Sequence, residues 1–390
     1  MTKLTSDELM SEIISFSKDS MKVVVLIGEN GVGKSTLLAK LSKNLLSSRT
    51  NDSIIAISNT PHDKFPEDDK RLQYLGQRDG ILYASKAIKE LLNAPGNHIS
   101  GKVRKLSDML IRLGYEKWVG LALDGFDPIQ TTSRTGTRAE LESLIRKIAS
   151  TVQDRWNGTS TPVIWLNLDD HNESKTGASF APSILGNENE LIELGALKAI
   201  KVLLYKTAVG CNKQIDLNTA SSGEISYLAT MAWASSKVKE NSVLLIEEPE
   251  NSLHPKWQIR YIETLHSLFG YEAPLVVIAT HSPLLLSGQD PAGVDVIPYK
   301  IEEDGSALRI SNIYDGLEGV SWSAFGVLPS NNQYLSGFLI ELINQYCKDI
   351  ITFEQAEKSI IQLAKACVDE DQILVVETFG NVLKRAKDEK

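Results

Sequence analysis

The sequence predicts an α/β fold in which a mostly parallel sheet is covered by helices on both faces. The first observation is a set of apolar, often β-branched runs that have the character of buried strands. The second is that helical spacing of apolar residues follows several of these runs after a loop, for example over 34–46. The predicted strands are KVVVLIG (22–28), SIIAIS (53–58), PVIWLNLDD (162–170), VLLIEE (243–248) and LVVIATHS (275–282).

The rest of the chain favours helices. Residues 6–18 have the spacing of a short amphipathic helix, and a polar loop with two prolines follows the second strand at 59–70. Residues 83–210 are predicted to be mostly helical apart from the strand at 162–170, and the apolar pattern of 187–206 is taken as a helix. The chain shows no internal repeat.

Composition indicates an ordinary globular protein. The chain has 390 residues, of which 42% are hydrophobic and 23% charged, enough for one large or two smaller cores. Three scattered cysteines, Cys211, Cys347 and Cys367, favour a reducing cytoplasm over a disulfide framework or a zinc site. No apolar run approaches the roughly 20 residues that span a bilayer, and the first residues lack the apolar core of a signal peptide. A cytoplasmic protein without a membrane partner is expected.

The net charge of −9 gives no general attraction for nucleic acid. Two small basic clusters, GKVRK (101–105) and LKRAK (383–387), leave local contact with DNA open, although such clusters are usually solvated faces.

The strongest chemical pattern follows the first predicted strand. GENGVGKS (28–35) matches G-x-x-x-x-G-K-[ST] in full and precedes a predicted helix. Its glycines let successive N–H groups turn inward as an anion nest, toward which the following helix points its positive end. Lys34 can then reach the outer phosphates of a nucleotide, and the Ser35 hydroxyl can bind Mg²⁺.

Two adjacent glutamates end the strand at 243–248. In a phosphate-binding sheet a second strand delivers an acid to Mg²⁺, and Glu247 is expected to do so through water. Glu248 would face the other way if the strand continues that far, which would free it to polarise the attacking water. The alternative is two acids at a surface strand end.

Two further features complete the pattern. The strand at 275–282 ends in Thr280 and His281, and a histidine there can contact a terminal phosphate, although a lone histidine is more often structural. Ser222 and Gly223 open a predicted helix and offer free N–H groups without a phosphate motif beside them. They make sense as an anion site that closes on ATP bound to another subunit, or as a plain helix cap.

These motifs occur in the order found in the ABC-type ATPases, and the sequence resembles the branch that contains SMC, RecF and the OLD (overcoming lysogenization defect) family. SSGE and EEPENSLHP…ATHSP are similar to those of OLD-like ATPases in bacterial phage-defence systems. The resemblance covers 22–60 and 215–290. It implies a P-loop fold with an ABC-type ATPase core, ATP and Mg²⁺ as cofactors, and a head-to-head homodimer that sandwiches two ATP molecules.

The resemblance also assigns residues. Catalysis would fall to Lys34, Glu248 as base, and His281 at the γ-phosphate. Mg²⁺ would be held by Ser35 and Glu247, with Gln77 as the candidate for the family's glutamine near the metal; the alternative is an exposed loop glutamine. The expected nucleotide-binding residues are Gly28, Glu29, Asn30, Gly31, Gly33, Lys34, Ser35 and Thr36, together with Ser222, Gly223 and Glu224 of the opposing subunit.

The resemblance implies a division of the chain. The ATPase core would comprise 1–84 and 211–300, with a mostly helical insertion at 85–210 and an α-rich extension at 301–390. The insertion lacks sustained heptads, so a compact lid or partner-docking subdomain is expected rather than a coiled-coil arm. One departure is that a helix, and not paired strands carrying an aromatic residue, precedes the phosphate loop, which leaves the adenine contact open.

Three functions remain. The first is an ATPase switch that controls a partner effector, a nuclease or toxin, in anti-phage defence. The second is an OLD-like DNA nuclease, disfavoured because the acids of DEDQILVVETFG (369–380) run in reverse order and the segment could equally be a closing helix. The third is the ATP-binding subunit of a transporter, disfavoured by the short SSGE signature and the long middle segment.

Overall fold

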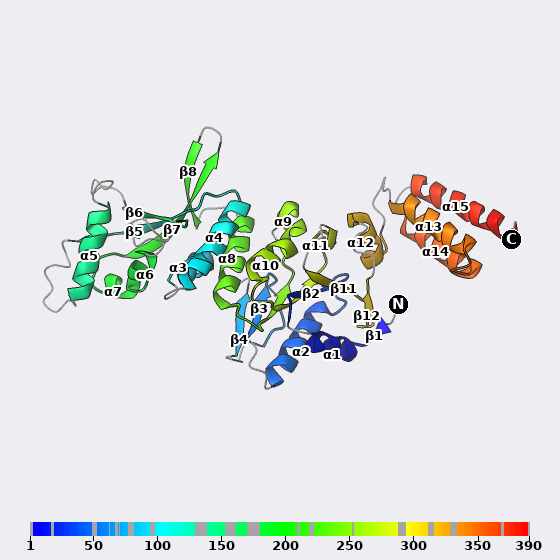
Figure 1. Cartoon of the computed structure of the whole chain (residues 1–390), viewed down its shortest axis with the longest axis horizontal. Helices are drawn as coiled ribbons and strands as arrows, with labels where there is room; N and C mark the ends of the chain where they lie inside the picture. Colours follow the sequence, from blue (N-terminus) through cyan, green and yellow to red (C-terminus); the bar gives the residue numbers. More distant parts are fainter. Residues whose placement is uncertain are drawn as a thin grey trace. The chain divides into compact units, whose positions relative to one another are not determined.

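The structure is a computed structural model in which two compact units are described, 1–72 with 240–390 and 73–239. We call them the core unit and the middle unit, and Figure 1 shows their elements. The described residues are 3–16, 19–48, 53–61, 63–66, 69, 71–76, 82–93, 98–128, 139–152, 161–169, 180–208, 211–217, 222–251, 253–287, 294–310, 316–327, 334–367 and 370–388.

An eight-stranded sheet organises the core unit, in the order β1-β12-β11-β2-β10-β9-β3-β4. Strands β11, β2, β10, β9 and β3 pair in parallel, whereas β12 pairs antiparallel with β11 and with β1. The α/β prediction with a mostly parallel sheet is confirmed. The strands are β1 (Lys3–Leu4), β2 (Lys22–Ile27), β3 (Ile54–Ser58), β4 (Leu72–Gly76), β9 (Val243–Glu247), β10 (Leu275–Thr280), β11 (Asp295–Ile301) and β12 (Ala307–Arg309).

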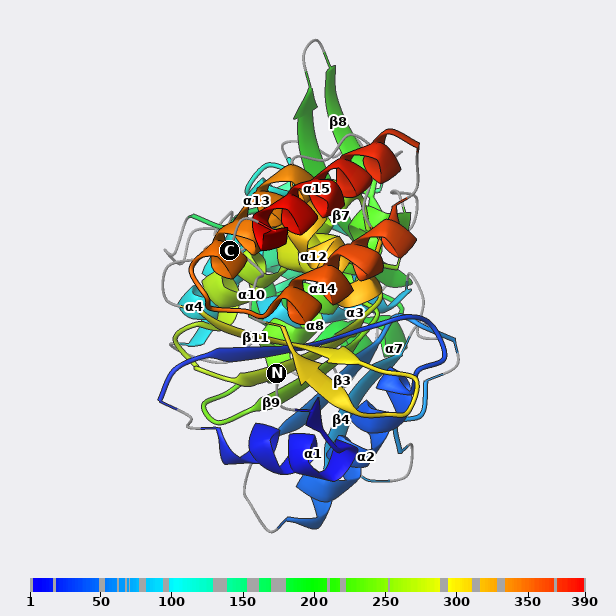
Figure 2. The same cartoon turned by 90° about the vertical axis from the view of Figure 1, so that its right-hand side faces the viewer.

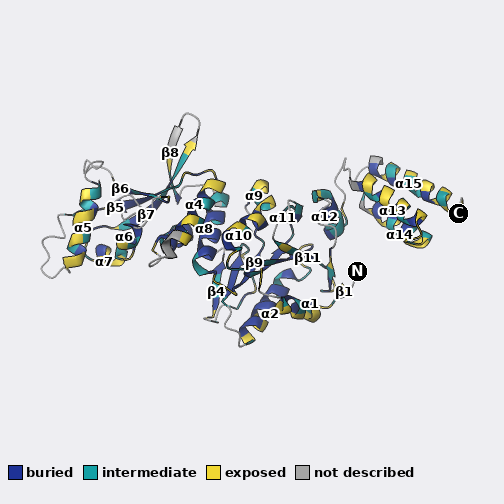
Figure 3. Cartoon of the chain, in the orientation of Figure 1, coloured by how far each residue is buried: buried dark blue, intermediate teal, exposed yellow. Residues whose placement is uncertain are grey.

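The central strands are buried along most of their length, as their continuous apolar sequences require. Every residue of β9 is buried, and so is β2 beyond its first residue (Figure 3). Helix α2 contacts β3, β9 and β10, so it covers one face of the sheet. The helices of this unit before its C-terminal segment are α1 (Ser6–Ser15), α2 (Lys34–Ser47), α9 (Pro255–Ile259), α10 (Tyr261–Phe269), α11 (Leu284–Ser287) and α12 (Gly316–Phe325).

The register of the central strands positions the predicted site. Thr280 of β10 pairs with Ile27 of β2, and Ala279 pairs with Glu247 of β9. Because these strands are parallel, the phosphate loop, the glutamate pair and His281 all follow strand ends at the same edge of the sheet. That edge is where open α/β sheets bind ligands.

The middle unit contains a four-stranded antiparallel sheet in the order β6-β5-β7-β8. Its strands are β5 (Trp118–Asp124), β6 (Val163–Asn167), β7 (Ala199–Ala208) and β8 (Cys211–Asp216). Its helices are α3 (Leu82–Leu92), α4 (His98–Arg112), α5 (Ala139–Val152), α6 (Ala181–Leu185), α7 (Glu188–Glu193) and α8 (Ser222–Lys237). Helix α8, which was expected to belong to the ATPase core, lies in this unit because it packs against α3 and α4.

The segment 85–210 was expected to be mostly helical, but it contains strands β5 and β7 in addition to the predicted strand at 162–170. The predicted helix at 187–206 is a short helix followed by a strand. Residues 188–193 form α7, but β7 begins at Ala199. Ile200, Val202 and Leu204 are buried while Lys201 between them is exposed, which is the period-two alternation of a strand. The leucines and lysines of this segment also suit a helix, so pairing with β5 and β8 decided its structure.

Three helices form a separate cluster at the C-terminal end: α13 (Tyr334–Cys347), α14 (Phe353–Ala366) and α15 (Glu370–Asp388). They contact one another, and Figure 2 shows their ribbons side by side. The buried residues of the cluster include Leu339 and Leu363. The closing helix predicted as the alternative to nuclease acids is α15; Asp369 lies outside the described residues. Within the described residues, no helix combines the length and apolar content needed to cross a membrane.

Candidate functional site

The phosphate loop joins β2 to α2 in a conformation that only glycine adopts easily. Gly31 and Gly33 have φ angles of 88° and 101°, in the left-handed region. A β-carbon on Gly28 would lie 2.8 Å from the carbonyl oxygen of Ile301 in the neighbouring strand β11. The motif's first glycine is therefore required by close packing, and the other two by backbone turns.

Lys34 lies folded over this loop. Its Nζ donates hydrogen bonds to the carbonyl oxygens of Gly28 and Glu29, at 2.9 and 2.8 Å, and the residue is 5% exposed. Burial lowers the pKa of Lys34, while the nearby carboxylates of Glu248, Glu250 and Glu247 oppose the shift. An ammonium group held over a glycine-rich turn fits a phosphate group at that position.

The loop side chains around Lys34 differ in exposure. Glu29 and Asn30 are exposed, whereas Ser35 and Thr36 in the first turn of α2 are half-buried. Nζ of Lys64, which the sequence reasoning did not single out, donates a hydrogen bond of 2.7 Å to Oγ1 of Thr36. A second lysine therefore lies against the first turn of α2, and the signal that could have found it is its place in the polar loop after β3.

Glu247 is the last residue of β9 and is 2% exposed. Ser58, at the end of β3, donates a hydrogen bond of 3.3 Å to its Oε2, and Ser35 also hydrogen-bonds to its carboxyl. Burial raises the pKa of Glu247, the two serine hydrogen bonds lower it, and Asp63 and Glu248 raise it further. A buried carboxylate beside the hydroxyl of Ser35 offers two of the hard oxygen ligands that Mg²⁺ prefers.

Glu248 does not continue the strand. Its φ angle is 45°, so its backbone is in the left-handed region and its side chain is not placed by strand alternation. Nδ2 of Asn251 donates a 3.1 Å hydrogen bond to its Oε2, and Nδ1 of His281 lies 3.3 Å from its Oε1. The structure thus brings Glu248 and His281 together, and it adds Asn251, which the sequence reasoning missed.

Glu250 is a second residue that the sequence reasoning missed. Its side chain is 4% exposed, and its Oε1 accepts hydrogen bonds from Thr280 Oγ1 at 2.5 Å, the His281 N–H at 2.7 Å and the Ser282 N–H at 3.1 Å. Nδ1 of His281 also lies 3.1 Å from this oxygen. Glu250 therefore fixes the turn that carries His281. The sequence signal that could have found Glu250 is that it is the third acid of EEPE. Its hydrogen-bond partners, however, lie 30 to 32 positions away in the sequence.

Removing this carboxylate should destabilise the core unit. We expect Glu250→Ala to lower the free energy of unfolding by about 2–4 kcal/mol, because the Thr280 hydroxyl and the His281 N–H lose their acceptor and the Ser282 N–H keeps only Thr280 Oγ1. Glu250→Gln keeps an acceptor oxygen and should cost less. Urea denaturation measures both, with Thr280→Val as a comparison that removes one hydroxyl, which donates to Glu250 and accepts from the Ser282 N–H. Equal stability of Glu250→Ala and wild type would show that these bonds contribute nothing.

The signature segment, Ser222, Gly223 and Glu224, opens α8 in the middle unit. The Glu224 carboxyl accepts a hydrogen bond of 2.5 Å from the Tyr115 hydroxyl, and Lys206 Nζ lies 3.5 Å from its other oxygen. Burial and this hydrogen bond raise the pKa of Tyr115. Glu224 thus anchors the start of α8 to its own unit, and nucleotide binding by the segment stays a prediction. Gln77, the candidate metal glutamine, lies outside the described residues.

The residues present fit a magnesium nucleotide. Within the part of the chain that the structure describes, no group of three or more His, Cys, Asp or Glu side chains could hold a metal ion unaided. Mg²⁺ typically takes one or two protein ligands and completes its shell with water and phosphate oxygens. Ser35 and Glu247 would hold it on those terms, and Lys34 with the Gly31–Gly33 turn would hold the phosphates.

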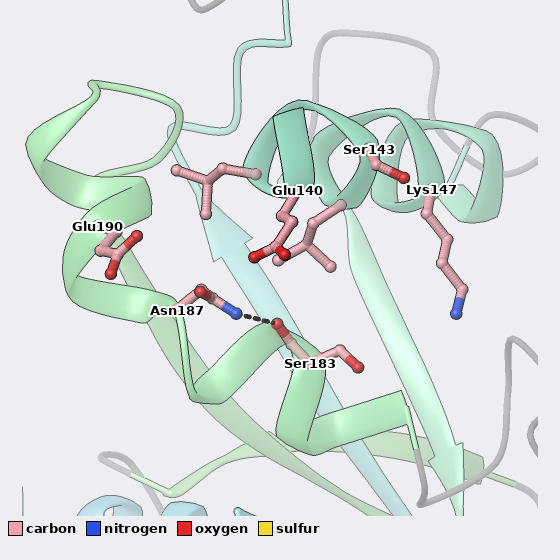
Figure 4. A pocket seen from close by; sticks show the side chains of 8 residues that line it. Glu140, Ser143, Lys147, Ser183, Asn187 and Glu190 are labelled. Atoms are coloured by element: carbon pink, nitrogen blue, oxygen red, sulfur yellow. Dashed lines mark hydrogen bonds between the residues drawn. The ribbon is translucent and has the colours of Figure 1, made fainter. Parts of the chain in front are cut away.

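The middle unit has a cavity of about 310 Å³. None of the residues predicted for the site lines this cavity. It lies between α5 on one side and the short helices α6 and α7 on the other, and its polar lining residues come from all three helices (Figure 4). Asn187 Nδ2 donates a hydrogen bond of 2.9 Å to the backbone oxygen of Ser183 across its floor. Its charged residues, Glu140, Lys147 and Glu190, are exposed, so the cavity is an open polar hollow.

Comparison with known proteins decides the family. A model described as "AAA domain, putative AbiEii toxin, Type IV TA system" matches residues 84–287, just over half of the chain. The chain belongs to this AAA-domain family. A second model, described as "ABC transporter", matches residues 12–149, which include the phosphate loop. Both describe ATPase domains, so this AAA-domain protein is an ATPase with an ABC-type P-loop core, as its motifs predicted.

Other comparisons add little to the AAA-domain assignment. Among solved structures, the structure of VirB4 of Thermoanaerobacter pseudethanolicus is similar, with a TM-score of 0.29 and 9% identity over 73% of this chain and 78% of that chain. A TM-score this low supports no argument about the site. No curated protein matches the sequence.

Proposed function

We propose that this AAA-domain protein is a cytoplasmic, Mg²⁺-dependent ATPase switch of the OLD-like branch. It closes head-to-head as a homodimer on ATP and controls a separate effector in anti-phage defence. The observation that supports it most is the catalytic edge, defined as Lys34, Glu247, Glu248 and His281 at the ends of neighbouring strands and loops of one sheet. Electrostatic links join these residues: the carboxylates of Glu247 and Glu248 act on Lys34, and Glu248 lies beside His281.

The catalytic edge divides the work of phosphoryl transfer. Lys34 binds and orients the terminal phosphates, while Glu247 and Ser35 hold Mg²⁺, which neutralises developing charge when bound. Glu248, oriented by Asn251 and His281, accepts the proton of the attacking water. Positioning and charge stabilisation supply most of the rate in such reactions, which is why the hydrogen-bonded supports around Glu248 matter.

The proposed dimer follows from the signature segment. A helix start with free N–H groups suits a phosphate, and Ser222 and Gly223 have no phosphate motif beside them in the sequence. In the proposed closed state they complete the site of the opposing subunit. Their anchoring through Glu224 to Tyr115 keeps the start of α8 in place for that contact.

The effector role is supported by the family and by the parts of the chain outside the catalytic edge. The family description names a putative AbiEii toxin of a type IV toxin–antitoxin system, and we propose that the ATPase acts together with an effector in such a system. The antiparallel sheet of the middle unit and the α13–α15 cluster supply no residue to the catalytic edge among the described residues. We assign them to partner binding.

Mixing two inactive variants tests the shared site. Lys34→Ala lacks a working phosphate loop and Ser222→Arg lacks a working signature. Each should hydrolyse ATP poorly alone, and an equimolar mixture should recover up to about a quarter of wild-type activity. Half of the subunits pair as heterodimers on random mixing, and each heterodimer has one intact composite site. Steady-state ATPase assays measure this.

A mixture no more active than its components would place each site within one chain and contradict the dimer. Each variant alone, assayed at the total protein concentration of the mixture, controls for concentration effects. Co-purification from the native host tests the effector: a nuclease or toxin is the expected companion, and a membrane permease would contradict the proposal.

A further inference from the structure

A cavity of about 360 Å³ lies beside the phosphate loop, within the range of roughly 300–1,000 Å³ that small-molecule pockets occupy. Glu29 and Val32 of the loop form one wall. The end of β11 with the turn that follows it forms a second wall, and Ala324 and Phe325 at the end of α12 form a third. All of these residues belong to the core unit.

We propose that this cavity holds the purine base of the nucleotide whose phosphates lie over Gly31–Lys34, with Phe325 as the stacking residue. The inference rests on the proposed ATP binding and adds the residues that contact the base. The sequence lacks an aromatic residue on paired strands before the phosphate loop, so the base needs another contact. Phe325 lies almost 300 positions after that loop, and the fold brings it to the same cavity as Val32.

The apolar part of the cavity suits a flat ring. Phe325 and Val32 are both half-buried, so each has a face exposed toward the cavity that they line. Val32 lies close to β11, since the point where a β-carbon on Gly28 would sit is 3.3 Å from the Val32 side chain and 2.8 Å from the Ile301 oxygen. An aromatic base that stacks on a side chain gains free energy whatever its sequence context, since every base has a π-face.

The polar part of the cavity favours a base that carries N–H donors. Glu302, Glu303 and Asp304 line it, and a carboxylate only accepts hydrogen bonds. Asp304 is engaged by Lys3 at 2.6 Å and Glu302 by Lys300 at 3.1 Å, whereas the structure shows no such pair for Glu303 among the described residues. The exocyclic amino group of adenine satisfies such an acceptor, as would that of guanine or cytosine, so the acids suit the adenine of the ATP that the proposed function requires.

Hydrogen bonds hold the backbone of the turn that carries these acids. The Glu302 N–H donates to the Ser306 oxygen at 2.9 Å, and the Gly305 N–H donates to the Glu302 oxygen at 2.9 Å. Gly305 has a φ angle of 77°, and its oxygen accepts a 2.7 Å hydrogen bond from the Ser6 hydroxyl of α1. The turn between β11 and β12 is therefore fixed at both ends, and Glu303 is held near its tip.

The test uses isothermal titration calorimetry in the presence of Mg²⁺. It compares the binding of two probes, ATP and inorganic tripolyphosphate. Wild type should bind ATP more tightly than tripolyphosphate, because tripolyphosphate has no base. Phe325→Ala should weaken ATP binding about tenfold, from the loss of base stacking, and leave tripolyphosphate binding unchanged. Unchanged tripolyphosphate binding also shows that the variant is folded. Phe16→Ala, another half-buried phenylalanine of the core unit that does not line the cavity, is the matched control.

The outcomes separate the base site from the proposed function. If wild type binds both probes equally, or Phe325→Ala binds ATP as wild type does, the base site is overturned while nucleotide binding at the loop stands. If wild type binds neither probe, nucleotide binding itself fails, and the base site with it. A loss of both ATP and tripolyphosphate binding in Phe325→Ala would show a folding role for Phe325 and would also overturn the assignment.

Discussion

Glu248→Gln is expected to slow ATP hydrolysis by about 10²–10⁴-fold while ATP still binds. Glutamine keeps the shape of the side chain and an oxygen that can accept from Asn251 Nδ2, at 3.1 Å in the wild type, but it cannot take the proton of the attacking water. Bound ATP should accumulate without turnover, and the proposed dimer should persist in the closed state. Single-turnover kinetics with labelled ATP and sedimentation in the presence of MgATP measure the two effects.

A matched control is available on the same unit. Glu240→Gln makes the same chemical change at an exposed glutamate and should leave turnover unchanged. The alternative outcome is informative: hydrolysis at the wild-type rate in Glu248→Gln would show that another group accepts the proton, and Glu250 and His281 would be the next residues to test. The left-handed φ angle of 45° at Glu248 strengthens the prediction, because non-glycine residues held in that region cluster at functional sites.

Lys34→Ala is expected to weaken ATP binding by about 10–100-fold, which corresponds to one strong charge-assisted hydrogen bond to phosphate. The same change removes the donor that bridges the carbonyl oxygens of Gly28 and Glu29, so the loop itself should lose order. It also leaves the carboxylates of Glu247, Glu248 and Glu250 without the cation that faces them. Equilibrium titration with a fluorescent ATP analogue gives the affinity.

Lys40→Ala is the control, since Lys40 is exposed on the same helix α2 and its removal should not change affinity. An unchanged affinity in Lys34→Ala would mean that the loop does not hold the phosphates. Thermal unfolding without nucleotide separates the two consequences, because a loop that loses order lowers the melting temperature whether or not ATP is present.

Much of the catalytic edge could be predicted because its chemistry is local in sequence. GENGVGKS specifies a strand, a glycine turn and a helix within eight residues, and the turn angles at Gly31 and Gly33 agree with that pattern. The acid pair was placed correctly at a strand end, since an apolar run that stops at two charges rarely continues as a buried strand. Glu248 was predicted to face away from Glu247 only if the strand continued through it. The strand ends one residue earlier, at Glu247, so strand alternation does not place Glu248.

The long-range parts were not predictable in the same way. The hydrogen bonds of Glu250 to Thr280, His281 and Ser282 connect a turn after β9 to a turn after β10, and no local pattern encodes that pairing. The strand β7 was taken as a helix because its side chains suit both structures, and its partners β5 and β8 fixed the outcome.

By itself, the sequence determined the fold class and singled out the residues predicted to bind phosphate and Mg²⁺, because glycine turns, strand hydrophobicity and side-chain charge are properties of short segments. The tertiary structure alone decided which of these segments meet: parallel pairing brings Lys34, Glu247 and His281 to one edge, and packing brings Phe325 to the cavity beside the loop. The physical reason is that contacts across a sheet depend on register and on the burial of whole elements, which are set by the complete set of strands and helices at once.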